Sequence, residues 1–267
     1  MVRLICIDVD GTLVGSSGGV RPEVWEAAAR AQKVGIRLAI CSGRPAFGAT
    51  REYARCLDAD GWHVFQNGAS VVHLPSGESR STALPGETAA MLVARARARR
   101  RVLELYTDIE YAVESDSDRA RRHAELLGVP FARRPFASLG GAVVRGQWLV
   151  APAELDAVIA EGHPGLNVSP STSPVMPDTV FVNLTLAGVD KAHAVRAVAA
   201  AYAFPLADVM VVGDGHNDAT AMAAVGWPVA MANADDAARA AAKIHVGHVD
   251  DNGLVEAIEI AITSRRV

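Results

Sequence analysis

The sequence has few cysteines and no hydrophobic run long enough to cross a bilayer. Its three cysteines, Cys6, Cys41 and Cys56, form no CxxC pair and are odd in number, so we expect reduced core residues. No apolar stretch approaches the roughly 20 residues of a membrane span. The N-terminus also lacks the basic and apolar segments of a signal peptide. We therefore expect a cytoplasmic protein without a membrane partner.

The charge balance gives no indication of a nucleic-acid partner. The 267 residues carry 26 basic and 30 acidic side chains, a formal net charge of −4 at pH 7. One basic run, RARARRR at 95–101, stands out, but the segment 84–186 around it holds 11 Arg against 12 Asp and Glu. We interpret the run as a solvated helix face, with recognition of an anionic substrate as the second choice.

Short apolar runs alternate with helical patterns at both ends of the chain, which favours right-handed βαβ units and a parallel sheet. The predicted strands of this sheet are 2–9, 35–42, 62–67, 208–214 and 227–233. The predicted helices are 21–34, one beginning at Pro45, 191–203 and one near 253–263. The stretch 70–84 is typical of a hairpin at the sheet edge, because a Pro-Ser-Gly turn divides two extended pieces.

The middle of the chain has a different order of elements, which begins with a long Ala/Arg-rich helix. The predicted elements there are helices at 87–101 and 118–127, strands at 102–107, 110–114, 143–150 and 179–186, and a Pro/Ser-rich loop at 169–177. We therefore predict an α/β protein with a Rossmann-like parallel-sheet core, residues 1–83 and 187–267. An inserted α+β domain, residues 84–186, interrupts this core.

Four core strands end abruptly at small polar or acidic residues beside glycine. Asp8 and Asp10 follow the first strand in ICIDVDGT, and Ser42 follows the second in AICSGRP. The other two ends are VFQNG (64–68) and VVGDGHND (211–218). Residues two apart on a strand share a face, so Asp8 and Asp10 are expected to point the same way. A parallel sheet brings all four ends to one rim, where ligands bind.

Asp8, Asp10, Asp214 and Asp218 would then crowd this rim, and carboxylates that close repel by several kcal/mol at an effective dielectric of about 20. A cation relieves the repulsion. Because the donors are oxygens without a Cys/His cluster, we expect Mg²⁺, which also favours phosphate-bearing substrates.

The rim also carries features suited to an anion. The glycine-rich turns supply backbone N–H groups. A helix beginning at Pro45 would place Ser42 and Arg44 near a helix N-terminus, where a phosphoryl group binds well.

Four motifs, DVDGT (8–12), SGR (42–44), GVDK (188–191) and GDGHND (213–218), occur in this order. Together they resemble the four motifs of the haloacid dehalogenase superfamily. An insert between the second and third motifs resembles the Cof-type sugar-phosphatase branch. The superfamily's dehalogenases, phosphonatases and P-type ATPases lack an Asp two residues after the nucleophile, so the resemblance implies a phosphatase or phosphomutase.

The resemblance also implies residue roles. Asp8 is the expected nucleophile, which forms an aspartyl-phosphate, and Asp10 is the expected general acid and base. Ser42 and Lys191 are expected to hold the phosphoryl oxygens. The implied Mg²⁺ ligands are Asp8, Asp10 through its carbonyl, Asp214, Asn217 and Asp218, the last two as ligands or as support for the shell. The expected contacts to substrate or phosphate are Gly11, Thr12, Gly43, Arg44 and Asn67.

The expected function is Mg²⁺-dependent hydrolysis of a phosphomonoester of a small metabolite, most simply a sugar phosphate, by a monomer or homodimer. The insert is expected to act as a lid that sets specificity. One alternative is a phosphomutase of the phosphomannomutase type, which would return the phosphoryl group to a sugar. The other is a non-catalytic protein that binds a phosphorylated metabolite without turnover.

Overall fold

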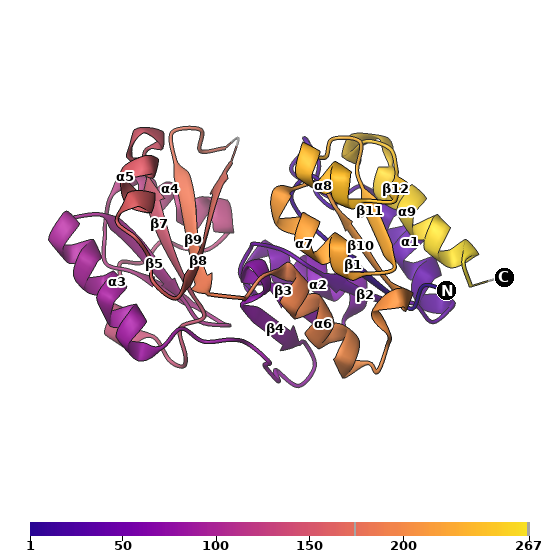
Figure 1. Ribbon diagram of the computed structural model, residues 1–267, viewed down its shortest axis with the longest axis horizontal. Helices are drawn as coiled ribbons and strands as arrows, with labels where there is room; N and C mark the ends of the chain where they lie inside the picture. Colours follow the sequence, from indigo (N-terminus) through magenta and orange to yellow (C-terminus); the bar gives the residue numbers. More distant parts are fainter. Residues whose placement is uncertain (174, 266–267) are drawn as a thin grey trace.

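The computed structural model describes residues 1–173 and 175–265, whose elements form two lobes side by side (Figure 1). The first lobe holds both ends of the chain and a five-stranded parallel sheet. Its strands are β1 (Leu4–Ile7), β2 (Arg37–Ile40), β10 (Val209–Gly213), β11 (Trp227–Ala230) and β12 (Ile244–His245). Their order is β12-β11-β10-β1-β2, and every neighbouring pair is parallel.

Helices cover both faces of this sheet. They are α1 (Pro22–Lys33), α2 (Ala49–Asp58), α6 (Lys191–Ala201), α7 (His216–Ala224), α8 (Asp236–Ala241) and α9 (Gly253–Thr263). Along β1, Ile5 and Ile7 join the apolar cluster formed with α1, α2 and α9. Leu4 and Cys6 join the cluster formed with α6, α7 and α8. A strand buried on both faces explains the unbroken apolar run in its sequence.

A hairpin of β3 (Trp62–Phe65) and β4 (Ser70–His73) adds to the edge of the parallel sheet. β3 contacts it through a single parallel bridge between Val64 and Cys41, and β4 pairs antiparallel with β3. The chain after β4 turns back, with the His73 backbone N–H donating to the Glu78 carbonyl at 2.9 Å. The predicted hairpin within 70–84 is therefore confirmed.

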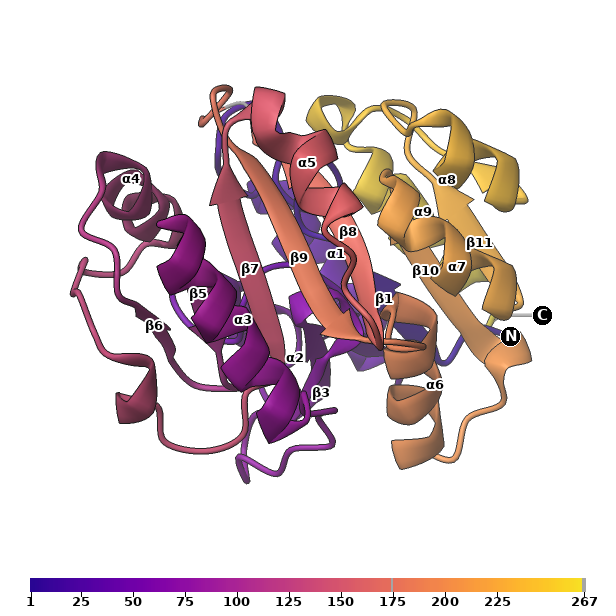
Figure 2. The same cartoon turned by 60° about the vertical axis from the view of Figure 1, so that its left-hand side comes forward.

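The second lobe is built on an antiparallel sheet of order β6-β5-β7-β9-β8. Its strands are β5 (Val102–Tyr106), β6 (Tyr111–Val113), β7 (Arg145–Val150), β8 (Leu166–Thr172) and β9 (Val180–Leu186). Its helices are α3 (Gly86–Arg99), α4 (Asp118–Leu127) and α5 (Leu155–Ala160). Figure 2 shows α3 and α5 over one face of the sheet, where Leu92 and Val158 join the cluster around the buried Trp148.

The short 3₁₀ turns are Gln66–Gly68, Phe136–Ser138, Pro152–Glu154, Leu206–Asp208 and Val249–Asp251. The architecture confirms the predicted α/β class, with a parallel-sheet core and an α+β part that is formed by the middle of the chain.

The predicted loop at 169–177 is partly wrong, because β8 extends through Thr172. β8 is the outer strand of its sheet and pairs only with β9. An edge strand tolerates proline and exposed polar side chains, since one row of its backbone groups needs no partner strand. Pro170 and the serines on either side of it have a composition typical of a loop, although they belong to the edge strand β8.

The two lobes also meet through one carboxylate. Asp108 lies in the turn between β5 and β6 and accepts hydrogen bonds from three serine hydroxyls of the first-lobe hairpin. The hydroxyls of Ser79 and Ser81 each lie 2.6 Å from it, and the Ser70 hydroxyl is the third donor. Beside them, the Gln66 side-chain amide donates to the Thr107 carbonyl at 2.8 Å. We call Asp108 and its three serines the serine clasp.

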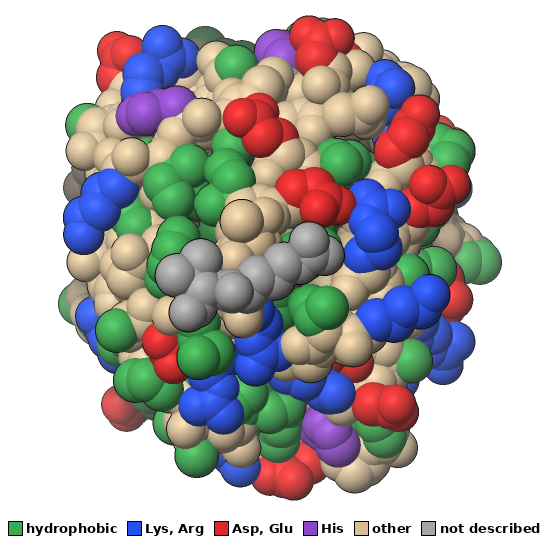
Figure 3. Space-filling view, turned by 90° about the vertical axis from the view of Figure 1, so that its right-hand side faces the viewer, with side chains coloured by type: hydrophobic (Ala, Val, Ile, Leu, Met, Phe, Trp, Pro, Cys, Tyr) green, Lys and Arg blue, Asp and Glu red, His purple; other side chains and the backbone are tan. Residues whose placement is uncertain are grey.

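On the first-lobe face seen in Figure 3, basic and acidic side chains are interspersed rather than gathered by sign. Among the helices of the described ranges, none combines the length and the apolar character needed to span a bilayer.

We predict that Asp108→Ala lowers the free energy of unfolding by about 1–3 kcal/mol, because three hydroxyls lose a charged acceptor. Urea unfolding followed by circular dichroism measures the change. Asp156→Ala is the matched control, since Asp156 is an exposed residue of α5, and it should stay within about 0.5 kcal/mol of wild type. Equal stability of the two variants would contradict a stabilising role for the serine clasp.

Candidate active site

Asp8 stands at the carboxyl end of β1 and is only 7% exposed. Its backbone N–H still bonds to the Val212 carbonyl of β10 at 3.0 Å, which fixes the residue at the rim of the sheet. The chain then turns tightly through Gly11, whose φ is +81°. A Cβ on Gly11 would lie 2.1 Å from Oδ2 of Asp214, so only glycine lets the loop pass this carboxylate.

Lys191 is the first residue of α6 and is 1% exposed. Its Nζ donates to Oδ1 of Asp8 and to Oδ1 of Asp218, both at 2.6 Å. The helix begins here because the Asp190 side chain accepts from the His193 backbone N–H at 2.8 Å and caps the first turn. Burial alone would lower the pKa of Lys191, but Asp218 and Asp8 raise it above the usual lysine value. The ammonium therefore stays charged between two carboxylates.

Asp214 follows β10 and faces the same point. Its Oδ1 accepts from the Thr12 hydroxyl at 2.8 Å, and its Oδ2 accepts from the Asn233 amide at 3.3 Å. Burial raises the pKa of Asp214 to about 7; the Thr12 hydrogen bond opposes this rise, and the nearby Asp218 adds to it. Thr12, expected to contact phosphate, thus uses its hydroxyl on Asp214 in this structure.

Asp218 lies in the first turn of α7 and has both carboxylate oxygens engaged. Oδ1 accepts a hydrogen bond from the Lys191 ammonium, and Oδ2 accepts from the backbone N–H groups of Asp214 at 3.2 Å and Gly215 at 3.0 Å. These bonds cap the start of α7. Asp218 is therefore better placed to orient Lys191 and the Asp214 loop than to give a free oxygen to a metal.

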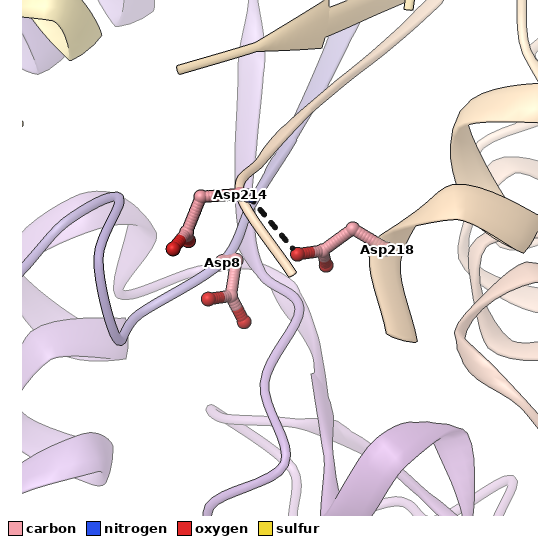
Figure 4. Close-up of side chains that lie close together, drawn as sticks. All are labelled: Asp8, Asp214 and Asp218. Atoms are coloured by element: carbon pink, nitrogen blue, oxygen red, sulfur yellow. Dashed lines mark hydrogen bonds between the residues drawn. The ribbon is translucent and has the colours of Figure 1, made fainter. Parts of the chain in front are cut away.

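Figure 4 shows Asp8, Asp214 and Asp218 converging from three segments of the chain. Each offers an oxygen within 4.8 Å of the others, and in the described ranges this is the one such group of acidic, histidine or cysteine side chains. Burial raises the pKa of Asp8 well above its usual value; Lys191 counters this, and Asp218 and Asp214 reinforce it. The donors are hard oxygens facing one another with excess negative charge, so they fit Mg²⁺.

The Ser42 loop is held by backbone pairing rather than by a helix start. The expected helix at Pro45 is wrong: α2 begins at Ala49, after Gly48 with φ +62°, a conformation that a helix cannot continue. Ser42 instead donates its backbone N–H to Val64 at 3.0 Å, continuing the β2–β3 bridge. Its hydroxyl oxygen accepts from the Arg44 backbone N–H at 3.1 Å, and the residue is buried at the rim.

Asp10 differs from Asp8 in direction and exposure. It was expected to share a face with Asp8, but β1 ends at Ile7, so the two-residue strand period does not extend to it. Its exposed carboxylate pairs with Arg44, at 2.9 Å from Nε and 2.5 Å from Nη2. The Asp10 carboxylate therefore stands apart from the other three, and its carbonyl stays the predicted metal ligand.

Two asparagines link the second and fourth motifs. The Asn217 amide donates to Oδ1 of Asn67 at 2.9 Å. A Cβ on Gly43 would lie 3.0 Å from the same Asn67 oxygen, so Gly43 lets this side chain approach the loop. Asn67 itself has φ +55°, a conformation that asparagine tolerates better than most residues. Both readings of Asn67, a turn residue and a site residue, are compatible with this geometry.

The sequence reasoning missed Asn233. Its amide donates to the Gly11 carbonyl at 2.8 Å and to Asp214, while its Oδ1 accepts from the Val249 backbone N–H at 3.1 Å. Asn233 thereby joins the loops that follow β1, β11 and β12. The signal was present, because WPVAMAN (227–233) is a fifth strand end that stops at a small polar residue.

Comparison with known proteins identifies the chain at the family level. The profile of the haloacid dehalogenase-like hydrolase family matches residues 5–135 and 161–258. The chain belongs to this family. The predicted resemblance is thus confirmed, and so is the expectation of a phosphatase-type hydrolase.

Relatives of this haloacid dehalogenase-like hydrolase match over 97–99% of the chain. "Putative phosphatase YxeH" of Bacillus subtilis is 25% identical and covers 99% of this chain and 100% of its own. A haloacid dehalogenase-like hydrolase from Bacteroides thetaiotaomicron is 27% identical, with a TM-score of 0.86 over 97% of this chain and 99% of that one. The HAD subclass IIB sugar phosphatase BT4131 shares the fold, at 20% identity and a TM-score of 0.80 over 97% and 98% of the two chains.

The raised pKa of Asp214 predicts how stability changes with pH. A carboxyl whose pKa is raised from 3.8 to about 7 binds its proton more tightly in the folded state. The contribution of this group to the free energy of unfolding is complete below pH 3.8, its pKa in the unfolded chain. That contribution is lost as the pH rises toward about 7, by up to about 1.4 kcal/mol per pH unit. Urea unfolding in EDTA from pH 4.5 to 8 should show this loss of stability. In Asp214→Asn the free energy of unfolding should depend less on pH over the same range.

Saturating Mg²⁺ is the control for this prediction. A bound cation replaces the proton, so above pH 6 it should narrow the difference in unfolding free energy between wild type and Asp214→Asn. Parallel pH curves for wild type and Asp214→Asn in EDTA would contradict the assignment.

Proposed function

We propose that this hydrolase removes the phosphoryl group of a small phosphorylated metabolite, with a sugar phosphate as the simplest case, in a Mg²⁺-dependent reaction through an aspartyl-phosphate on Asp8. The observation that supports it is the arrangement around Asp8. Oδ1 is held by Lys191, and no described residue donates to Oδ2. One carboxylate oxygen is thus fixed by a cation while the other is left to act as nucleophile.

In the first step, Oδ2 of Asp8 forms a bond to phosphorus as the bond from phosphorus to the leaving oxygen breaks. Asp10 gives its proton to that oxygen, so the product leaves as an alcohol. In the second step, Asp10 takes a proton from water, whose oxygen attacks phosphorus and releases phosphate and Asp8. An exposed carboxylate paired only with Arg44 can exchange protons in this way after the pair opens.

The phosphoryl oxygens need donors that are already in place. Lys191 uses two of its three N–H bonds on Asp8 and Asp218, which leaves a third for a phosphoryl oxygen. Ser42 and Gly43 follow β2 at the same rim, whereas the Gly11 backbone N–H already donates to the Val14 carbonyl at 3.0 Å. Asp8, Asp214 and the Asp10 carbonyl, with Asn217 or Asp218 in support, would hold Mg²⁺, which supplies charge neutralisation at the transferring group.

The second lobe fits the role of a lid. We propose residues 84–186 as this cap domain, with residues 1–83 and 187–267 as the catalytic core. Support comes from the contact of Arg145 in β7 with the Gly43 carbonyl, at 2.8 Å, in the Ser42 loop. A cap seated there excludes water from the phosphoryl site and contacts the leaving group. The similarity of the fold to that of the sugar phosphatase BT4131 supports a sugar phosphate as substrate.

Asp8→Asn should reduce phosphate release from a generic aryl phosphate by about 10³-fold or more, because the amide cannot form the acyl-phosphate. Phosphate release with Mg²⁺ measures the rate, and circular dichroism checks that the fold is unchanged. Asp156→Asn, on exposed α5, is the control and should retain wild-type turnover. Near wild-type turnover by Asp8→Asn would end the proposed mechanism.

Product analysis distinguishes hydrolysis from phosphoryl return to a sugar. With hexose phosphates as substrates, we expect free phosphate to equal the substrate consumed. Interconversion of hexose phosphates with little free phosphate would instead identify a phosphomutase. Tight binding of these compounds without turnover would identify a phosphometabolite-binding protein.

A further inference from the structure

Arg145 is a buried cation on the cap side of the candidate site. It is the first residue of β7 and is 3% exposed. Its Nη1 donates to the Gly43 carbonyl at 2.8 Å and to Oδ1 of Asn183 at 3.0 Å. Arg145 therefore lies where the second lobe meets the loop that carries Ser42.

The charge of Arg145 has no carboxylate partner among the described residues. The Tyr106 ring lies 4.0 Å from its guanidinium carbon and provides a cation–π contact but no carboxylate charge. The nearby acid is Glu104, but its carboxylate accepts from the Tyr106 hydroxyl and bonds to Nδ1 of His123 at 2.8 Å. Burial lowers the pKa of Arg145, and Tyr106 and Glu104 only partly oppose this.

The edge of the guanidinium formed by Nε and Nη2 is the part that lacks a partner. Nε is buried without a hydrogen bond, and no described residue accepts from Nη2. In this chain the same edge binds carboxylates elsewhere: Arg30 holds Glu259, Arg44 holds Asp10, and Arg97 holds Glu114. It is also the edge that suits a carboxylate or phosphate in two-point contact.

We propose that the Nε–Nη2 edge of Arg145 binds a second anionic group of the substrate, a carboxylate or a second phosphate carried by the leaving group. The inference rests on the proposed phosphatase function and narrows its substrate class to acidic phosphometabolites, such as phosphorylated sugar acids or sugar bisphosphates. A neutral hydroxyl would satisfy one donor but leave the buried charge unbalanced, and an unpaired buried charge is costly.

The test compares phosphomonoesters that carry a second anionic group with related phosphomonoesters that lack one. One pair is glycerol 3-phosphate and 3-phosphoglycerate. A second set is a hexose 6-phosphate, the 6-phosphohexonate and the hexose 1,6-bisphosphate. We expect wild-type kcat/KM to be about tenfold or more higher for an anionic member than for its neutral partner. The sugar-acid and bisphosphate arms show which of the two anions binds Arg145.

Arg145→Gln should bring that ratio to about one, and Arg145→Lys should restore only part of it, because an ammonium cannot make the two-point contact. If Arg145 only supported the Gly43 loop, Arg145→Gln would lower kcat/KM for all substrates alike and leave the ratio of anionic to neutral substrates unchanged. That result would overturn the proposal. Arg101→Gln is the control, since Arg101 also lies in the second lobe against an aromatic ring but is paired with Glu161. It should keep the wild-type ratio.

If Arg145→Gln fails to fold, the kcat/KM values of the wild-type enzyme for the anionic and neutral substrates still test the proposal. Hydrolysis of all members without preference for the anionic ones overturns this inference and leaves the phosphatase function standing. Absence of phosphate release from every member and from an aryl phosphate overturns both.

Discussion

The ammonium of Lys191 between Asp8 and Asp218 is the contact on which the site depends. It joins the start of α6 to the end of β1 and to the first turn of α7. Along the chain, Lys191 lies 183 residues from Asp8 and 27 residues from Asp218. With Asp214 added, three carboxylates face one ammonium, so the cluster is short of positive charge even when Lys191 is protonated. Burial makes this deficit costly. Burial is the main cause of the raised pKa values of Asp8 and Asp214, and the neighbouring carboxylates add to it; a proton or a divalent cation relieves both effects.

Much of this arrangement could be predicted, because a parallel sheet brings the carboxyl ends of its strands together at one rim. Asp8, Ser42 and Asp214 each end an apolar run, and parallel strands place such ends at one rim whatever their separation in sequence. The same rule also predicts a site residue at Asn233, because it follows the apolar run of β11. Lys191 does not follow from the rule, since it begins a helix; its place was implied by family resemblance.

The errors share a physical cause, which is local composition overridden by tertiary contacts. Pro45 suits a helix start, yet the chain there forms a series of bends after Ser42 pairs with β3, and α2 begins only after Gly48. Pro170 suits a loop, yet pairing with β9 makes it part of an edge strand. The direction of Asp10 depends on where β1 ends and on Arg44, and neither periodicity nor propensity contains that information.

Two of the contacts between the lobes, the serine clasp and Arg145, differ in what their separation would cost. The serine clasp pairs a carboxylate with neutral hydroxyls at a partly exposed seam, so water can replace the hydroxyls if the lobes part. Arg145 is different, because docking takes its charge out of water and returns only the Gly43 carbonyl. The Asn183 amide oxygen and the Tyr106 ring belong to the same lobe as Arg145 and are present whether or not the lobes dock. Docking of the empty cap is thus opposed by desolvation of one guanidinium, and an anion that enters with the substrate removes that opposition. Since a ligand shifts an equilibrium only by its differential affinity for the two states, the proposed anion contact would make closure of the proposed cap and recognition of the leaving group one event.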